Sequence, residues 1–377
     1  MSSFRVTTIR GIPIRIHITF LIVLPLIAYG FGRAFLDAAQ LANVPPQQLT
    51  GSPWLWGFGV AVALFASVLV HELAHAFYAL RAGGRVEDIT LYMIGGVSRI
   101  SESPQRLGQE AVMALVGPLT SLALGGVFYV LQLLTFGTAF NLRFAFFYLA
   151  ILNIFLGVFN LLPAFPMDGG RILRSVLAIR LGLLRATRVA ARVGQVFAVL
   201  FGVWGFISLN VLLLLIAFFV FVGAEAENRA VMVKAVLGQL RIQDVMSTQV
   251  FLLPADTTAD EAANRMLKER RLSYAVTVDG QRTGVLTLDA IASVPLERRR
   301  QTLAGDIAVQ TPPLAPSEEA VKALQMMNET NLPEMIVSEG GRPVGTVNRE
   351  DLMRMLKLTE LQSTKRRGVS PPWPRGA

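Results

Sequence analysis

Residues 54–80, WLWGFGVAVALFASVLVHELAHAFYAL, form an apolar run that contains the pattern His71-Glu72-Leu73-Ala74-His75. An apolar run of about 20 residues or more is typical of a helix that spans a membrane. Ionisable groups at membrane depth are costly, so by default they mark a functional site. Residues four apart lie on one face of a helix, which lets His71 and His75 reach a single zinc ion. Glu72 lies beside them, where it can take a proton from an attacking water.

The composition of the whole chain agrees with a membrane protein. Of its 377 residues, 53% are hydrophobic and 16% are charged, whereas an average soluble domain has about 25% charged residues. The absence of cysteine excludes a disulfide scaffold, an iron–sulfur cluster and a thiolate metal site. The chain has three histidines, which excludes a histidine-rich site; we expect His17 to be an interfacial or hydrogen-bonded residue.

Five apolar stretches predict six spanning helices. The stretches are residues 12–31, 54–80, 111–134, 144–162 and 189–222. The last stretch is too long for one helix, and we divide it at Ser208-Leu209-Asn210. The sequence thus predicts a polytopic α-helical membrane domain over residues 1–225.

The arginines indicate the orientation of these helices. They gather at the N-terminus, after the second helix and after the fourth, whereas the alternate loops carry few charges. Basic loops stay on the cytoplasmic side, so we expect a multi-pass protein of the plasma membrane with both termini in the cytoplasm. Because topology accounts for the net charge of +9, we expect no nucleic-acid partner.

A catalytic zinc needs a third protein ligand and an open position, and Asp168 is the strongest candidate. It follows the predicted fourth helix in the segment Asn160-Leu-Leu-Pro-Ala-Phe-Pro-Met-Asp168-Gly-Gly-Arg171. The two prolines end the helix on the side of His75, and the glycines allow a tight turn. The alternative is an ordinary aspartate that caps the next helix.

The pattern at 71–75, together with Asn-x-x-Pro-x-x-x-x-Asp-Gly at 160–169, resembles the site-2 protease family of intramembrane zinc metalloproteases. The resemblance covers roughly residues 10–225. It implies one zinc ion per chain, bound by His71, His75 and Asp168, with Glu72 as the catalytic base. It also makes Asn160 a candidate for holding the substrate or the oxyanion.

Two further segments fit this reading. Residues 87–98 alternate like a strand, and such an edge could pair with an unwound substrate; we include Gly95 and Gly96 among the substrate or oxyanion candidates, although a simple cytoplasmic hairpin is the alternative. For Gly117-Pro118 we expect a role in helix packing.

From about residue 225 the composition becomes that of a soluble domain. We assign residues 226–360 to a cytoplasmic domain. Within it, residues 240–357 alternate short strands with helices and repeat at about 60 residues, with Asp244 matching Asp306, Met266 matching Met326, and Gly284 matching Gly345. The basic, proline-rich tail at 361–377 is predicted to be disordered.

The repeat resembles a tandem CBS domain (cystathionine β-synthase type) of α/β fold. The ribose-binding pattern of that family is Gly-apolar-apolar-Thr/Ser-x-x-Asp. The second repeat keeps Asp351 but has Asn348 at the hydroxyl position, and the first keeps Thr287 but has Ala290 at the carboxylate position. The resemblance implies either an adenine nucleotide site or a pair that only forms a homodimer.

The resulting prediction is an intramembrane zinc metalloendopeptidase that acts in regulated intramembrane proteolysis. It would cleave transmembrane or membrane-proximal segments of other membrane proteins, and a nucleotide at the CBS pair could gate it. The alternatives are a CBS-regulated transporter, which requires a polar track through several helices, and an inactive scaffold of the same fold, which the intact Glu72 disfavours.

Overall fold

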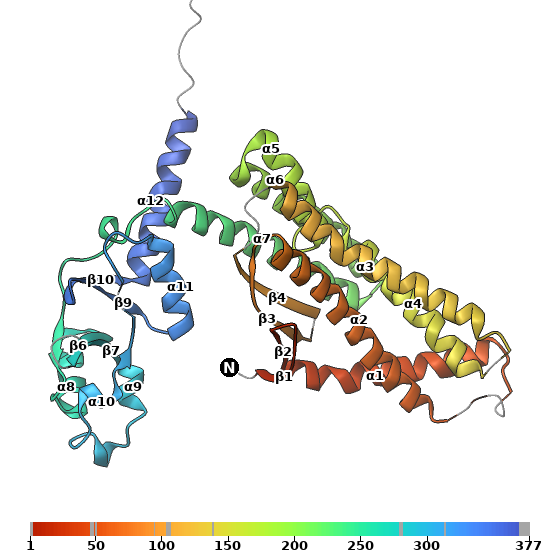
Figure 1. Ribbon diagram of the computed structural model, residues 1–377, viewed down its shortest axis with the longest axis horizontal. Helices are drawn as coiled ribbons and strands as arrows, with labels where there is room; N and C mark the ends of the chain where they lie inside the picture. The colour runs from red at the N-terminus through yellow and green to blue at the C-terminus, as the bar shows by residue number, and fades with distance from the viewer. Residues whose placement is uncertain are drawn as a thin grey trace, which may run out of the picture. The chain divides into compact units, whose positions relative to one another are not determined.

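The computed structural model describes residues 3–45, 49, 51–93, 95–102, 107–137, 139–278, 282–312 and 314–368. The chain divides into two compact units, Met1–Asn228 and Arg229–Ala377. The first consists of helices and one sheet, and the second is α/β (Figure 1).

Six helices in the described part of the chain are long and apolar enough to span a membrane, as predicted. They are α1 (Ile18–Leu41), α2 (Pro53–Arg81), α3 (Leu107–Leu134), α4 (Phe140–Asn160), α6 (Leu183–Ile207) and α7 (Val211–Leu237). The predicted division at 208–210 is confirmed. Leu209 has a φ of 50°, and the side chain of Asn210 accepts a hydrogen bond from the Leu213 amide at the start of α7.

The first predicted helix is wrong at its beginning, because Ile12–His17 form strand β2. Ile12 and Ile14 alternate with Pro13 and Arg15, and this period of two belongs to a strand with one buried face. Helix α1 begins only after His17, whose Nδ1 accepts a hydrogen bond from the Thr19 amide. His17 is therefore a hydrogen-bonded cap, as expected.

The four-stranded sheet of this unit has the order β1-β2-β3-β4, with β1 spanning Ser3–Ile9, β3 Arg85–Tyr92 and β4 Gly95–Glu102. Strands β2 and β3 are parallel and the other two pairs are antiparallel. The predicted strand character of residues 87–98 is thus confirmed in the described residues. One face of the sheet packs on α2, where Ile14 and Ile89 form a buried cluster with Leu73 and Ala76, and β4 lies at the sheet edge.

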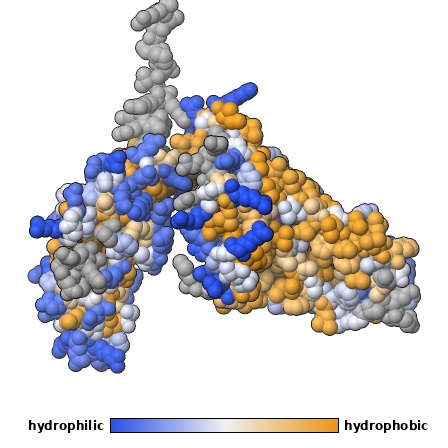
Figure 2. All heavy atoms as spheres, viewed as in Figure 1, coloured by the Kyte–Doolittle hydropathy of each residue, from blue (hydrophilic) through white to orange (hydrophobic). Residues whose placement is uncertain are grey.

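The outer surface of the first unit is apolar. Figure 2 shows hydrophobic residues covering the visible face of α3 and α4. Large side chains of these two helices are about half exposed, among them Val130, Leu133, Phe155 and Val158. Soluble monomers rarely expose apolar patches of this extent, so the surface is suited to lipid. The chain is a multi-pass membrane protein.

The described residues of the second unit form two sheets, β5-β6-β7-β8 and β9-β10. The strands are β5 (Leu252–Pro254), β6 (Ser273–Val278), β7 (Arg282–Thr287), β8 (Val309–Gln310), β9 (Glu334–Glu339) and β10 (Arg342–Asn348). The helices are α8 (Ala259–Glu269), α9 (Leu288–Ala292), α10 (Ala304–Ile307), α11 (Ala320–Thr330) and α12 (Arg349–Gly368), with short 3-10 turns at Ile242–Asp244 and Leu296–Arg298.

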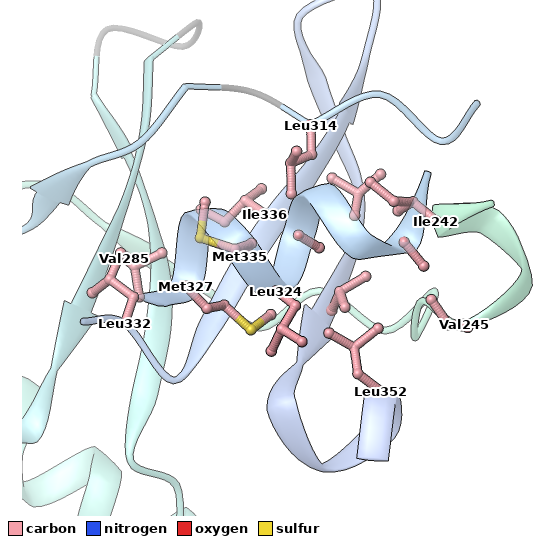
Figure 3. Close-up of a cluster of buried hydrophobic side chains, with 14 of the residues drawn as sticks. Ile242, Val245, Val285, Leu314, Leu324, Met327, Leu332, Met335, Ile336 and Leu352 are labelled. Carbon is pink, nitrogen blue, oxygen red and sulfur yellow. The ribbon is translucent and has the colours of Figure 1, made fainter. Parts of the chain in front are cut away.

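The internal repeat is visible in this unit. Helices α8 and α11 have the same length, so the buried Met266 corresponds to the buried Met327 and not to Met326 as predicted. The two repeats share a core, because Val285 of β7 joins Met327 and Met335 in one buried cluster (Figure 3). Helix α12 extends to Gly368, so residues 361–368 of the predicted disordered tail are helical; residues 369–377 lie outside the described residues.

Candidate metal centre and active site

Three ligand-type side chains from two helices converge inside the first unit. His71 and His75 lie one turn apart on α2, and Asp168 is the first residue of α5 (Asp168–Leu181). The two Nε2 atoms are 3.1 Å apart, and each is 3.2 Å from Oδ2 of Asp168. Both histidines are buried. Within the described residues, these three form the group of ligand atoms that could hold one metal ion.

Helix α3 orients both imidazole rings. Nδ1 of His75 lies 2.6 Å from the carbonyl oxygen of Met113. Because a carbonyl only accepts, Nδ1 must carry a proton. In the neutral ring, which is the form that binds a metal, the lone pair of Nε2 therefore faces the cluster. Nδ1 of His71 lies 2.9 Å from the hydroxyl of Ser121, which is fully buried. Such outer hydrogen bonds are the usual way in which a metal-binding imidazole is fixed.

Asp168 does not cap its helix. Met167 is the N-cap of α5, and no side-chain capping bond is present there. Burial tends to raise the pKa of the Asp168 carboxyl, but the hydrogen bonds with His71 and His75 outweigh it and hold this pKa well below its ordinary value. Asp168 is therefore a carboxylate aimed at the two imidazoles.

The charges around the cluster fit a divalent cation. Arg171 of α5 interacts with four carboxylates, those of Glu72, Glu110, Asp168 and Glu227. Arg174, also on α5 and buried, pairs with Glu110 and Glu227. In their ionised forms, these four carboxylates outnumber the two arginines that face them. Since buried charges need compensation, a metal ion with two positive charges suits both the donor atoms and the charge of the site.

The edge strand β4 passes directly over Glu72. The hydroxyl of Ser98 donates to Oε2 of Glu72 at 2.6 Å. A Cβ atom at Gly96 would stand 2.4 Å from Cγ of Glu72, so only glycine allows the strand to lie this close. The carboxylate of Glu72 is thereby held between the strand and the helix turn that carries His71.

The other predicted substrate and nucleotide residues make no hydrogen bond with the metal cluster in the described part of the chain. The amide of Asn160 donates to the Leu156 carbonyl of its own helix, and Gly95, at the start of β4, faces open space. In the second unit, Thr287 caps α9 by accepting from the Ala290 amide, and Asn348 accepts from the amide of Asp351.

Sequence reasoning missed three residues at the site. Ser98 and Ser121 bind Glu72 and His71 through contacts across the fold. Gly117 was expected only to pack helices, yet it lies directly against the two histidines. Gly117 on the predicted third helix indicates that another part of the chain can approach closely there. The sequence does not indicate that the approaching groups are the imidazoles of His71 and His75.

Two family models match this chain. The model described as peptidase family M50 matches residues 59–144 and 137–201, and the model of the CBS domain matches residues 242–297 and 304–358.

Several curated proteins are similar to nearly the whole chain. A zinc metalloprotease of Methanocaldococcus jannaschii is 30% identical over 360 residues, which cover 96% of this chain and 98% of the relative. Rip3 of Mycobacterium tuberculosis, which is named as a zinc metalloprotease, is 33% identical over 374 residues, which cover 94% of this chain and 92% of Rip3. Among solved structures, a site-2 protease from Methanocaldococcus jannaschii has 35% identity, covers 60% of this chain and 95% of its own, and gives a TM-score of 0.42.

Proposed function

Because this chain belongs to peptidase family M50, the zinc metalloproteases of site-2 protease type, and carries a tandem CBS domain, we propose that it cleaves transmembrane or membrane-proximal segments of other membrane proteins. The observation that carries the proposal is the convergence of His71, His75 and Asp168 beside Glu72.

Each residue of the cluster has a distinct role in the proposal. His71, His75 and Asp168 would hold one zinc ion, with the two imidazoles and the carboxylate as its ligands. Bound zinc supplies Lewis-acid activation of water and of the scissile carbonyl. Glu72 accepts a proton from the attacking water and passes it to the leaving amine. Met113 and Ser121 keep the imidazoles in the orientation that binding requires.

The substrate must present an unwound peptide. A peptide bond within a membrane helix is shielded because its backbone groups are bonded to each other. Strand β4 is the edge of its sheet and contacts Glu72 through Gly96 and Ser98. We propose that the unwound segment adds to β4 as a further strand, which would place its backbone beside the base. Asn160 and Gly95 stay secondary candidates for substrate contact.

The test is co-expression of the full-length chain with candidate single-span membrane proteins, followed by mapping of any new terminus by mass spectrometry. The wild-type chain should produce a new terminus in or next to the span, and Glu72→Gln should not. Glu87→Gln is the matched control, because Glu87 lies exposed on β3 and its substitution should leave cleavage intact. Equal cleavage by Glu72→Gln and the wild type would refute the proposal.

For the second unit we propose a regulatory role, in which the CBS pair forms a homodimer and an adenine nucleotide acts through the repeat that contains Asp351. A ligand can shift activity only if it binds one conformation better than another. Calorimetric titration of the full-length protein with ATP, ADP and AMP, beside Asp351→Ala, tests this role. Unchanged binding by the variant would refute the assignment of Asp351, and no binding at all would favour a purely structural pair.

A further inference from the structure

We propose that Ser98 is the positioning residue of the catalytic base: its hydroxyl holds the carboxylate of Glu72 in the orientation that proton transfer requires. The proposal rests on the proposed function of Glu72. Ser98 acts through Glu72, to whose carboxylate its hydroxyl donates.

The register of the sheet explains why a side chain at position 98 reaches Glu72. Ile14 of β2 is paired with Ile89 of β3, and Ile89 is paired with Ser98 of β4. Paired residues project from the same face of a sheet. The first two members of this row are buried against α2, so Ser98 faces α2 as well. Next to these two buried isoleucines, Ser98 on the edge strand donates its hydroxyl to the carboxylate of Glu72 on α2.

The geometry of the contact suits a charged acceptor. The distance of 2.6 Å between Oγ of Ser98 and Oε2 of Glu72 lies in the range of hydrogen bonds from a hydroxyl to an ionised oxygen, about 2.5–2.7 Å. Glu72 has no second hydrogen-bond donor among the described residues, so Oε1 is available to accept a proton. Gly96, two residues before Ser98 on the same face of β4, lies against the stem of the Glu72 side chain. Strand β4 thus binds the carboxylate through Ser98 and contacts the stem through Gly96.

This arrangement connects the substrate-binding edge with the base. A peptide that adds to β4 would use the backbone groups of the strand and not the Ser98 hydroxyl. Ser98 should therefore affect the chemical step and leave substrate binding unchanged. A general base contributes about 10²- to 10⁴-fold to a rate, and loss of alignment removes part of that factor.

The first test is kinetic and uses detergent-solubilised full-length protein with β-casein, an unfolded chain whose backbone is free to pair. Ser98→Ala should lower kcat by about 10- to 100-fold, the loss typical of a small misplacement, with KM unchanged. Ser98→Thr keeps the hydroxyl and should retain most of the activity. Ser67→Ala is the matched control, because the Ser67 hydroxyl bonds to the Ala63 carbonyl of its own helix. A raised KM with unchanged kcat, or no difference between the alanine and threonine variants, would overturn the proposal.

The second test needs no activity, so it separates failure of this proposal from failure of the proposed function. Thermal unfolding is followed for Ser98→Ala, Glu72→Ala and the double variant. If the two side chains are bonded, Ser98→Ala should lower Tm in the wild-type background and much less in the Glu72→Ala background. Ser67→Ala should shift Tm equally in both backgrounds. Additive shifts for Ser98 and Glu72 would overturn the proposal, even if casein proves not to be a substrate.

Discussion

Gly117 of α3 lies so close to His75 of α2 that a Cβ atom at position 117 would stand 2.2 Å from Nε2 of His75. The same atom would stand 2.8 Å from Nε2 of His71. The backbone of α3 therefore forms one wall of the candidate metal centre. A methyl group cannot be accommodated there without moving the two imidazoles.

Gly117→Ala should consequently lose most of its bound zinc while it still folds. The added methyl group would displace the Nε2 atoms that converge on Asp168. Zinc per chain is measured by elemental mass spectrometry on purified protein, with Gly126→Ala as the control on the same helix, because nothing lies within 4 Å of a Cβ atom there. If a folded Gly117→Ala protein kept its full zinc content, Gly117 would not lie against the two imidazoles as the structure places it.

The contrast between Gly117 and His71 shows what the sequence could and could not predict. The spacing of His71 and His75 is local, because a helix alone puts them on one face. Asp168 is predictable because it follows the end of the predicted fourth helix, which lies on the same side of the membrane as His75. The contacts of Gly117, Ser98 and Ser121 depend on which helices and strands become neighbours, and no local pattern encodes that.

The same reasoning applies to the fold. The six spanning helices were predictable because length and hydropathy suffice. The sequence does not separate the strand at Ile12–His17 from the first helix. Its alternation with a period of two is short and runs directly into the apolar stretch of the helix. In the second unit the repeat is predictable from the sequence. The predicted counterpart of Met266 is Met326, however, which is one residue before the counterpart in the structure, Met327.

Arg174 should be essential for the stability of the first unit. It is buried and pairs with Glu110 of α3 and Glu227 of α7. Arg174→Met would remove the cation that is paired directly with both carboxylates, and removing one member of a buried ion pair costs about 3–5 kcal/mol. We expect Tm to fall by roughly 10 °C, measured by intrinsic fluorescence in detergent.

Arg180→Met is the control for that variant, since Arg180 lies exposed near the end of the same helix. The double variant Arg174→Met, Glu110→Gln should recover part of the loss, because one uncompensated charge is removed. A Tm for Arg174→Met equal to that of Arg180→Met would contradict the role of this ion cluster.

The orientation of the chain in the membrane is a separate prediction. Basic segments near Arg15, Arg85 and Arg180 should lie in the cytoplasm, together with both termini. Reporter fusions at Asn43, between α1 and α2, and at Gly238, after α7, should report opposite sides of the membrane. Reports from the same side would require a different number of spans or an inverted orientation.

We propose that His71, His75 and Asp168 bind the zinc ion while Glu72 serves as the base. This assignment is tested by the zinc content of purified full-length protein and of three variants. We predict about one zinc per chain in the wild type and in Glu72→Gln, and a near-complete loss in His71→Ala and in Asp168→Ala. Zinc content that stays at the wild-type level in both His71→Ala and Asp168→Ala would contradict the claim.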